Sequence, residues 1–246
     1  MRWRAQVAYD GTDFLGWQTQ SGNGRTVQEE LERCLSTVLR ETIRVEAAGR
    51  TDTGVHARGQ VIAFDLGSDI PDVARALYSL NSVLPSEVQV ADLREASPDF
   101  DPRRQAVRRT YNYRIWNAAF PSPFEVRTSW HVRESLDLDK MRQAALVLPG
   151  RHDFFSFQSA DNIDRPSVRH LFAASLREEL PLVEIEIAAN AFCRGMVRNL
   201  VGQLVAIGRG RAPVGSMADL LSRRDRSQAA PAAPAQGLFL ESVEYP

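Results

Sequence analysis

The chain has 246 residues, of which 43% are hydrophobic and 25% are charged. This composition is ordinary for a soluble globular protein, and the length suffices for one large core or two small ones. The formal net charge is −1, with only two cysteines and four histidines, which argues against indiscriminate nucleic-acid binding, a disulfide framework and a thiolate metal site. No apolar run has the length of a signal peptide or of a membrane span, so we expect a cytoplasmic protein without a membrane segment or a metal.

The first hundred residues alternate between strand and helix patterns. Thr26-Val27-Gln28-Glu29 is a capping box, which predicts a helix from this point to about Arg40. The predicted elements in chain order are strand 3–9, helix 27–40, strand 42–46, strand 59–66, helix 71–82 and strand 87–93. The predicted order is therefore β-α-β-β-α-β.

The same order returns after a linker around residues 97–102. The predicted elements there are strand 107–116, helix 137–148, strands 168–177 and 182–188, helix 194–208 and strand 238–245. Two copies of a split β-α-β unit predict an α/β (α+β) fold with two ferredoxin-like halves, residues 1–100 and 101–246. The Ala/Pro-rich run 229–236 is interpreted as an ordered connector to the last strand, although its composition fits a flexible linker equally well.

The most distinctive local pattern is AGRTDTGVHA at residues 48–57, which sets Asp52 among small residues with a glycine on each side. A carboxylate with an ordinary pKa of about 3.9 is ionised at neutral pH and can act as nucleophile or base without an activating partner. Arg50 would keep it ionised and fix its direction. The alternative for an isolated turn of this kind is that Asp52 only caps backbone amides.

Further motifs follow in a definite order along the chain. They are YDGTDFLGWQTQ at 9–20, VQEELE at 27–32, RTYNY at 109–113, HDF at 152–154, NAFCRGMVRNLVG at 190–202, and GLFL at 237–240 before VEY at 243–245. Together with the stretch around Asp52, these segments resemble the tRNA pseudouridine synthase A family from end to end. The resemblance implies a pseudouridine synthase fold, in which the two halves join through a central, mainly antiparallel sheet beside an RNA-binding cleft. It also implies a cofactor-independent homodimer that isomerises uridines 38, 39 and 40 of the tRNA anticodon stem-loop.

The resemblance assigns catalytic roles to three residues. Asp52 would add to the uridine base or its ribose, or remove a ribose proton, and the residues leave these routes open. Tyr111 would lie against the uracil and offer its hydroxyl as acid or base, with core packing as the alternative and as the expected role of Tyr113. Arg198 would pair with Asp52.

The segment around Arg198 shows one departure from the family pattern. Arg194 is expected on the same helix four residues earlier, where it would repel Arg198 and contact RNA phosphate, a solvated helix face being the alternative. Gly195 stands where the family often has histidine, and we expect it to weaken the helix there.

Other predicted substrate contacts are cationic or lie in the first turn. Arg103, Arg104 and Arg108 suit phosphate contacts, although an exposed strand edge explains them as well. Arg109 in the same crowded segment is a further predicted substrate contact. Trp17, Gln18 and Gln20 are expected to contact RNA or support the cleft, with a core position as the alternative for Trp17. For His56 a packing or hydrogen-bonding role is expected rather than proton transfer.

Two rival functions use the same residues. Asp52-Thr53-Gly54 is also the tripeptide of aspartic peptidases, but those enzymes place it after an apolar strand and share a proton between two aspartates, which a preceding Arg50 would oppose. The second rival is a catalytically silent RNA-binding or RNA-folding module, against which the set of Asp52, Tyr111 and Arg198 argues.

Overall fold

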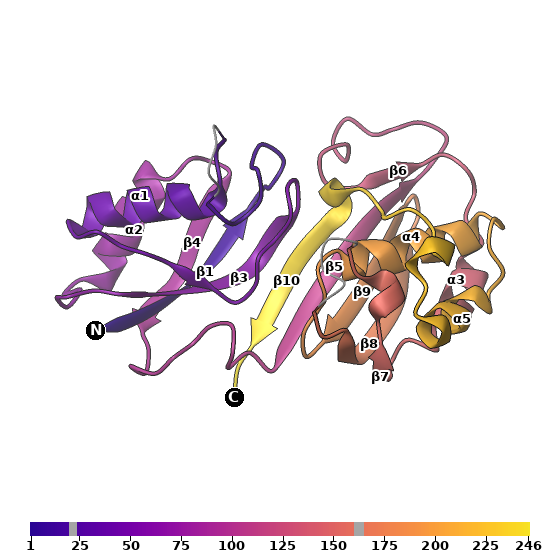
Figure 1. Ribbon diagram of the computed structural model, residues 1–246. Helices are drawn as coiled ribbons and strands as arrows, with labels where there is room; N and C mark the ends of the chain where they lie inside the picture. The colour runs from indigo at the N-terminus through magenta and orange to yellow at the C-terminus, as the bar shows by residue number, and fades with distance from the viewer. Residues whose placement is uncertain (20–23, 160–164) are drawn as a thin grey trace. The chain divides into compact units, whose positions relative to one another are not determined.

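The computed structural model describes residues 1–19, 24–159 and 165–246, so that Gln20 lies outside the described residues. The chain forms two compact units, Met1–Val107 with Phe239–Pro246, and Arg108–Leu238 (Figure 1). The expected halves, 1–100 and 101–246, differ from these units chiefly at the last strand. Strand β10 (Leu238–Glu244) pairs in parallel with β3 (His56–Asp65) through Phe239 and Leu240, which ties residues 239–246 to the first unit.

The first unit has the predicted β-α-β-β-α-β order. Its elements are β1 (Arg2–Tyr9), α1 (Val27–Leu39), β2 (Glu46–Ala47), β3, α2 (Val73–Val83) and β4 (Val88–Glu95). The strands form a sheet in the order β4-β1-β3-β10, with β2 beside β3, and all pairs except β3–β10 are antiparallel. The predicted capping box is confirmed, since Thr26 Oγ1 accepts from the Glu29 N–H at 3.3 Å and α1 begins at Val27.

The predicted strand 42–46 is the largest error in the first unit, because only Glu46–Ala47 is strand. Side chains of α1 take the main-chain donors of this segment: the Ile43 N–H donates to Ser36 Oγ at 2.9 Å and the Val45 N–H to Glu32 Oε1 at 3.1 Å. These two bonds hold residues 43 and 45 to α1, and the ladder with β3 begins only at Glu46.

The second unit contains the strands and helices predicted for the second half, except the last strand, and several further elements. In order they are β5 (Arg108–Asn117), β6 (Trp130–Val132), α3 (Leu138–Ala145), β7 (Gly150–Asp153), η1 (Phe155–Phe157), β8 (Val168–Glu179), β9 (Leu182–Ala189), α4 (Met196–Gly208), α5 (Ser216–Arg223), η3 (Arg226–Gln228) and η4 (Ala235–Gly237). The sheet order is β5-β9-β8-β7 with antiparallel pairs, and β6 pairs in parallel with β5. Both units thus have mainly antiparallel sheets, and the predicted fold class is confirmed.

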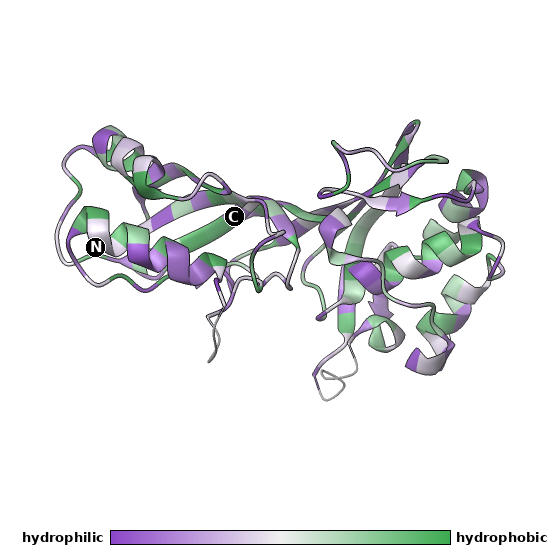
Figure 2. Ribbon diagram, turned by 90° about the horizontal axis from the view of Figure 1, so that it is seen from above, coloured by the Kyte–Doolittle hydropathy of each residue, from purple (hydrophilic) through white to green (hydrophobic). Residues whose placement is uncertain are grey.

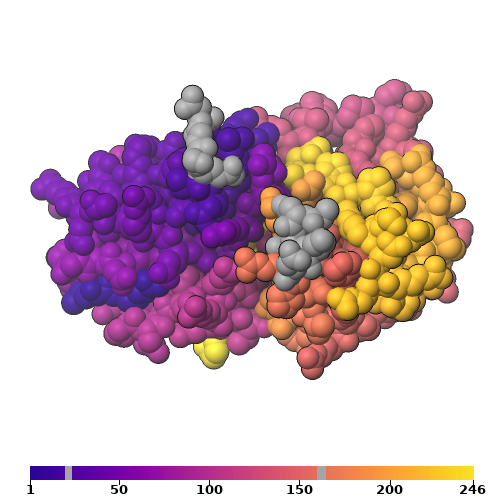
Figure 3. All heavy atoms as spheres, viewed as in Figure 1, coloured from indigo at the N-terminus to yellow at the C-terminus, as the bar shows by residue number. Residues whose placement is uncertain are grey.

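Helix α4, like the other helices drawn in Figure 2, carries both hydrophobic and hydrophilic residues, but nearly all of it is buried. Eleven of the thirteen residues of α4 are buried, including polar Asn199 and Gln203. Residues 216–236 belong to the yellow outer layer of the second unit on the face drawn in Figure 3. A helix that is covered this completely must satisfy its polar side chains internally.

Candidate active site

The aspartate loop, residues 48–55, connects β2 to β3 in the first unit. It is a tight turn in which the Val55 N–H donates to the Asp52 C=O at 3.1 Å, and Gly54 has a φ of 77°. At its base the Ala48 N–H donates to Val61 at 2.9 Å. Only the two residues of β2 precede the loop, so the long apolar strand of an aspartic peptidase is absent at this position.

The opening turn, residues 10–19, packs directly on the aspartate loop. The Trp17 N–H donates to the Thr51 C=O at 3.1 Å, and the Tyr9 hydroxyl lies 2.8 Å from Thr51 Oγ1. A Cβ at Gly11 would lie 2.0 Å from the Val55 carbonyl oxygen, and one at Gly16 would lie 2.9 Å from that of Thr51. The two glycines therefore allow a main-chain approach that no larger residue permits.

The burial of Trp17 corrects one expectation. Its side chain is only 2% exposed and contacts the Tyr9 ring at a centroid distance of 6.0 Å. The indole therefore offers no face on which an RNA base could stack, and Trp17 supports the aspartate loop from within the core. Gln18 is half-buried and donates through Nε2 to Gln28 Oε1 at 2.8 Å.

His56 supports the same region and is 1% exposed. The Gly11 N–H donates to its Nδ1 at 3.0 Å, and its ring stacks on Phe239 at 4.6 Å and 19°. Asp10 Oδ1 lies 3.2 Å from the same nitrogen, but an ion pair there would need a proton on Nδ1, which the Gly11 donor excludes. The predicted packing and hydrogen-bonding role of His56 is confirmed.

In the second unit, Arg109, Tyr111 and Tyr113 point to one face of β5, opposite Ala189, Ile187 and Ile185 of β9. Tyr111 is half-buried, and its ring meets Phe192 edge-on at 5.1 Å. Tyr113 is completely buried and donates its hydroxyl to the Pro234 C=O at 2.7 Å. Burial raises the pKa of Tyr113 far above its ordinary value. The core position predicted for Tyr113 is confirmed.

The four clustered arginines have different surroundings. Arg103 and Arg104 are exposed in a turn of the first unit. Their main-chain N–H groups donate to Asp101 Oδ1 at 2.8 and 2.9 Å. Arg108 is half-buried, with its guanidinium over the Phe172 ring at 5.4 Å. Arg109 is only 9% exposed and donates to the Asn190 C=O at 2.8 Å. The expectation that Arg109 contacts the substrate does not fit this burial, and its guanidinium ties β5 to the segment after β9.

The start of α4 corrects two further expectations. Gly195 is the N-cap, with a φ of 71°, and the helix begins at Met196. Arg194 therefore precedes the helix, and the helical spacing on which the predicted repulsion with Arg198 was based does not apply. Gly195 does not weaken the helix either, because it adopts the left-handed conformation that glycine favours just outside it. A Cβ there would lie 2.4 Å from Ser159 Oγ.

Arg198 lies in the first turn of α4 and is held from the side. Its Nε donates to the Ala233 C=O at 2.8 Å, and the Ala233 N–H donates back to the Arg198 C=O at 2.9 Å. Ala233 belongs to the connector, residues 229–236, which is thus ordered. No sequence pattern singled out Ala233, because its contribution comes from its main chain.

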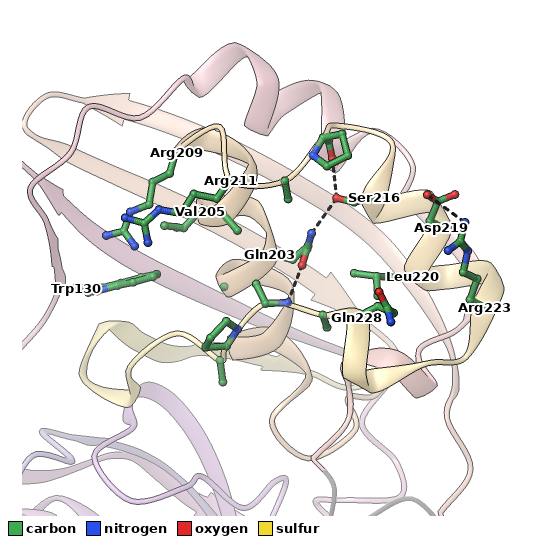
Figure 4. A pocket seen from close by; sticks show the side chains of 18 residues that line it. Trp130, Gln203, Val205, Arg209, Arg211, Ser216, Asp219, Leu220, Arg223 and Gln228 are labelled. Carbon is green, nitrogen blue, oxygen red and sulfur yellow. Dashed lines mark hydrogen bonds and ion pairs between the residues drawn. The ribbon is translucent and has the colours of Figure 1, made fainter.

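A separate cavity of about 520 Å³ lies in the second unit between α4, α5 and the connector (Figure 4). Trp130, Arg209, Arg211 and Gln203 are among its lining residues, whereas Asp52, Tyr111 and Arg198 are not. Within the described ranges, no cluster of three or more His, Cys, Asp or Glu residues could hold a metal ion. Among all the residues that the structure describes, no helix is long and apolar enough to cross a membrane.

Comparisons with known proteins agree with these motifs. The tRNA pseudouridine synthase family matches residues 5–103 and 144–246, which include Asp52, Arg194 and Arg198 but not Tyr111. The chain is 44% identical over 240 residues to tRNA pseudouridine synthase A of Moorella thermoacetica, covering 97% of each chain. It is 42% identical to the Myxococcus xanthus protein of that name, covering 99% of this chain and 92% of the relative.

A third relative, tRNA pseudouridine synthase A of Pelobacter propionicus, is 39% identical and covers 97% of each chain. A solved Cbf5–Nop10–Gar1 complex matches 82% of this chain and 45% of its own with a TM-score of 0.38 and 11% identity, too low to support an argument. The family match spans most of the chain and the curated relatives align over nearly its whole length, so the chain belongs to the tRNA pseudouridine synthase family.

Proposed function

We propose that this protein isomerises uridine to pseudouridine at positions 38, 39 and 40 of the tRNA anticodon stem-loop. The isomerisation itself rests on family membership and on relatives named tRNA pseudouridine synthase A. The structural observation that supports it best is the aspartate loop. Asp52 is the first residue of its turn, and Thr51, the residue before it, is hydrogen-bonded to Tyr9 and Trp17. A loop bound through main-chain groups can hold a carboxylate in one place while substrate enters.

The reaction sets the requirements for the site. The bond between N1 of uracil and C1′ of ribose breaks, the base rotates, and a bond between C5 and C1′ forms. The hydrogen on C5 leaves as a proton and N1 gains one, so that the mass of the nucleoside does not change. A stacked uridine cannot be reached, so the enzyme must extrude it at a cost of a few kcal/mol.

Three residues would carry this chemistry. Asp52 is the catalytic carboxylate, by attack on base or ribose or by removal of a ribose proton. Tyr111 lies against the loosened uracil, which fits its half-buried ring, and its hydroxyl serves as acid or base. Arg198 pairs with Asp52 and holds its direction.

The same proposal covers substrate contacts. Arg103 and Arg104 are exposed and would bind phosphates, with Arg108 and Arg194 as further contacts, while Arg50 and Gln18 would face the RNA around the aspartate loop. Phosphate contacts position an RNA without reading its sequence, and shape readout of a stem-loop would explain the use of neighbouring uridines. The protein would act in the cytoplasm as a homodimer, so that one tRNA spans both subunits.

Tritium release tests the proposal. Unmodified tRNA transcripts carrying 5-tritiated uridine are incubated with wild type, Asp52→Asn and Asp139→Asn, without added metal or cofactor. Asp52→Asn keeps the shape of the side chain and removes the carboxylate. Asp139→Asn is the matched control, because Asp139 is 95% exposed on α3. A second transcript with cytidine at positions 38, 39 and 40 tests the sites.

We expect release with wild type and Asp139→Asn, none with Asp52→Asn, and none from the second transcript. Release from the cytidine transcript would refute the positions but leave the isomerase standing. No release by folded wild type that binds tRNA would refute the enzyme and favour the silent RNA-binding module.

A further inference from the structure

The connector, residues 229–236, is bound to α4 along a continuous seam in the second unit. Ala233 is completely buried and exchanges two hydrogen bonds with Arg198, one of them from the side-chain Nε. This bond to Nε fixes the plane of the guanidinium before any substrate arrives. An arginine side chain has about 2 kcal/mol of rotamer entropy to lose, and a bond of this kind removes much of that cost in advance.

Gly202 and Gln203, in the middle of α4, fix the position of the connector along the helix. Gln203 is 2% exposed, and its Oε1 accepts from the Ala230 N–H at 2.9 Å while its Nε2 donates to Ser216 Oγ at 2.8 Å (Figure 4). At Gly202 a Cβ would lie 2.0 Å from the Pro231 carbonyl oxygen and 3.2 Å from the Ala233 nitrogen. The connector therefore approaches α4 as closely as it does only because residue 202 is glycine.

The next connector residue, Pro234, binds Tyr113 of the RTYNY segment at 109–113. The Pro234 C=O accepts from the Tyr113 hydroxyl, and Tyr113 lies two residues after Tyr111 on the same face of β5. The positive charge of Arg198 acts on Tyr113, opposing the increase of its pKa by burial. The consecutive carbonyl groups of Ala233 and Pro234 thus accept hydrogen bonds from Arg198 and Tyr113.

We propose that the connector is a positioning element of the active site, which orients Arg198 through the main chain of Ala233 and is itself seated by Gly202, Gln203 and Tyr113. This inference rests on the proposed role of Arg198 in uridine isomerisation. The connector touches neither substrate nor reacting atoms in this scheme. A displacement of about 1 Å in a positioned group can cost up to about 100-fold in rate.

Gly202→Ala is the most direct test. Alanine favours a helix over glycine by up to about 1 kcal/mol, so the substitution strengthens α4 itself and disturbs only the contact with the connector. Gly208→Ala is the matched control for added volume in the same helix, where a Cβ would meet the buried side chains of Met141 at 2.6 Å and Leu136 at 3.2 Å rather than the connector. Tyr113→Phe is a second, independent variant that removes only the donor to Pro234.

Each variant is made in the wild type and in an Arg198→Lys background, and tritium release from tRNA is followed in single turnovers with enzyme in excess. In the wild type we expect Gly202→Ala and Tyr113→Phe each to slow the maximal rate about tenfold, with the half-saturating enzyme concentration unchanged within about twofold. Gly208→Ala stays within about twofold. In the Arg198→Lys background both positioning variants add no further loss, because residues that act through one group are not additive.

Tenfold losses of rate in both the wild-type and the Arg198→Lys background would overturn the positioning role. A general structural effect would reduce the rate by the same factor whether or not Arg198 is present. A Gly202→Ala or Tyr113→Phe enzyme at the wild-type rate would also overturn the positioning role. Failure of the proposed function looks different: wild type then releases no tritium, or Arg198→Lys is as active as wild type.

Discussion

The hydroxyl of Tyr9 lies 2.8 Å from Oγ1 of Thr51, the residue immediately before Asp52. Both side chains are buried, at 4% and 7% exposure. Thr51 also accepts the Trp17 N–H through its carbonyl group. The residue before the proposed catalytic carboxylate is therefore fixed through both its main chain and its side chain.

Tyr9→Phe removes one partner of this buried pair and leaves the ring in place. The Thr51 hydroxyl then loses its partner, so we expect the free energy of unfolding to fall by about 1 to 2 kcal/mol. We also expect single-turnover tritium release to slow several-fold, because Asp52 is held less firmly. Urea unfolding and the release assay measure the two effects. Tyr78→Phe is the control, since Tyr78 is 77% exposed, and it should change neither value.

Alanine substitutions at Gly11 and Gly49 test whether the aspartate loop depends on close packing or only on the presence of glycine. Gly11→Ala places a Cβ 2.0 Å from the Val55 carbonyl oxygen, whereas Gly49→Ala meets nothing within 4 Å. We expect Gly11→Ala to destabilise the protein by about 1 to 3 kcal/mol and to slow isomerisation by about tenfold or more. Gly49→Ala, inside the aspartate loop, should leave both within experimental error or stabilise by up to about 1 kcal/mol.

Thermal unfolding together with the release assay distinguishes the two variants. Equal effects of Gly11→Ala and Gly49→Ala would mean that the loop tolerates or rejects any side chain regardless of packing. That result would contradict the bracing of the aspartate loop by the opening turn.

How far the sequence predicts this structure depends on where the stabilising groups lie. The alternation of 3–9 and the capping box at Thr26 predicted β1 and α1 correctly, because periodicity and capping are local properties. Segment 42–46 was mistaken for strand because it is rich in β-branched residues, whereas residues 43 and 45 bond to side chains of α1. Short β6 and β7 have too few residues to show a period.

The candidate site was predictable for the same reason in part. Asp52, Tyr111 and Arg198 stand in motifs, whereas their supports do not. Trp17 and Arg109 were assigned to RNA because residue type alone does not reveal burial. The Tyr9–Thr51 and Arg198–Ala233 bonds join residues 42 and 35 apart in sequence. Of the four bonds at Thr51 and Ala233, only the one between the Tyr9 and Thr51 hydroxyls uses no main-chain group.

A pH effect follows from the ion-pair cluster around Arg25, which joins Glu30 of α1 to Glu87 before β4 at 2.9 and 3.1 Å. Burial alone would raise the pKa of Glu30, but hydrogen bonds from Arg33 and Arg25 outweigh it and lower the pKa. Hydrogen bonds from its own backbone N–H and from Arg25 lower the pKa of Glu87. Both folded-state pKa values lie below the ordinary 4.5.

The unfolded chain therefore binds more protons than the folded one as the pH falls below about 4.5, and the stabilisation by the cluster is present above that pH and lost below it. Arg25→Gln should cost about 1 kcal/mol at pH 7, a modest value because these groups are partly exposed. The difference from wild type should shrink toward zero at pH 3 in urea unfolding. A difference that does not depend on pH would assign the effect of Arg25 to packing on Phe14, over which its guanidinium lies at 4.5 Å.

Asn199, the residue after Arg198, links three segments of the second unit. It is 1% exposed, its Nδ2 donates to the Phe157 C=O at 2.6 Å, and its Oδ1 accepts from Arg226 at 2.7 Å. Asn199→Leu would leave a buried carbonyl and the half-buried guanidinium of Arg226 without this partner. The expected cost is about 2 to 4 kcal/mol, because buried polar groups that lose their partners keep the full cost of desolvation.

A double-mutant cycle with Arg226→Met tests that explanation by urea unfolding. If the unpaired guanidinium causes much of the loss, the double variant is less destabilised than the sum of the single ones by at least about 1 kcal/mol. Asn112→Leu is the matched control, because the buried Oδ1 of Asn112 has no hydrogen-bond partner in the described part of the chain. Its loss should therefore cost little. Additive effects at Asn199 and Arg226 would show that each contributes separately.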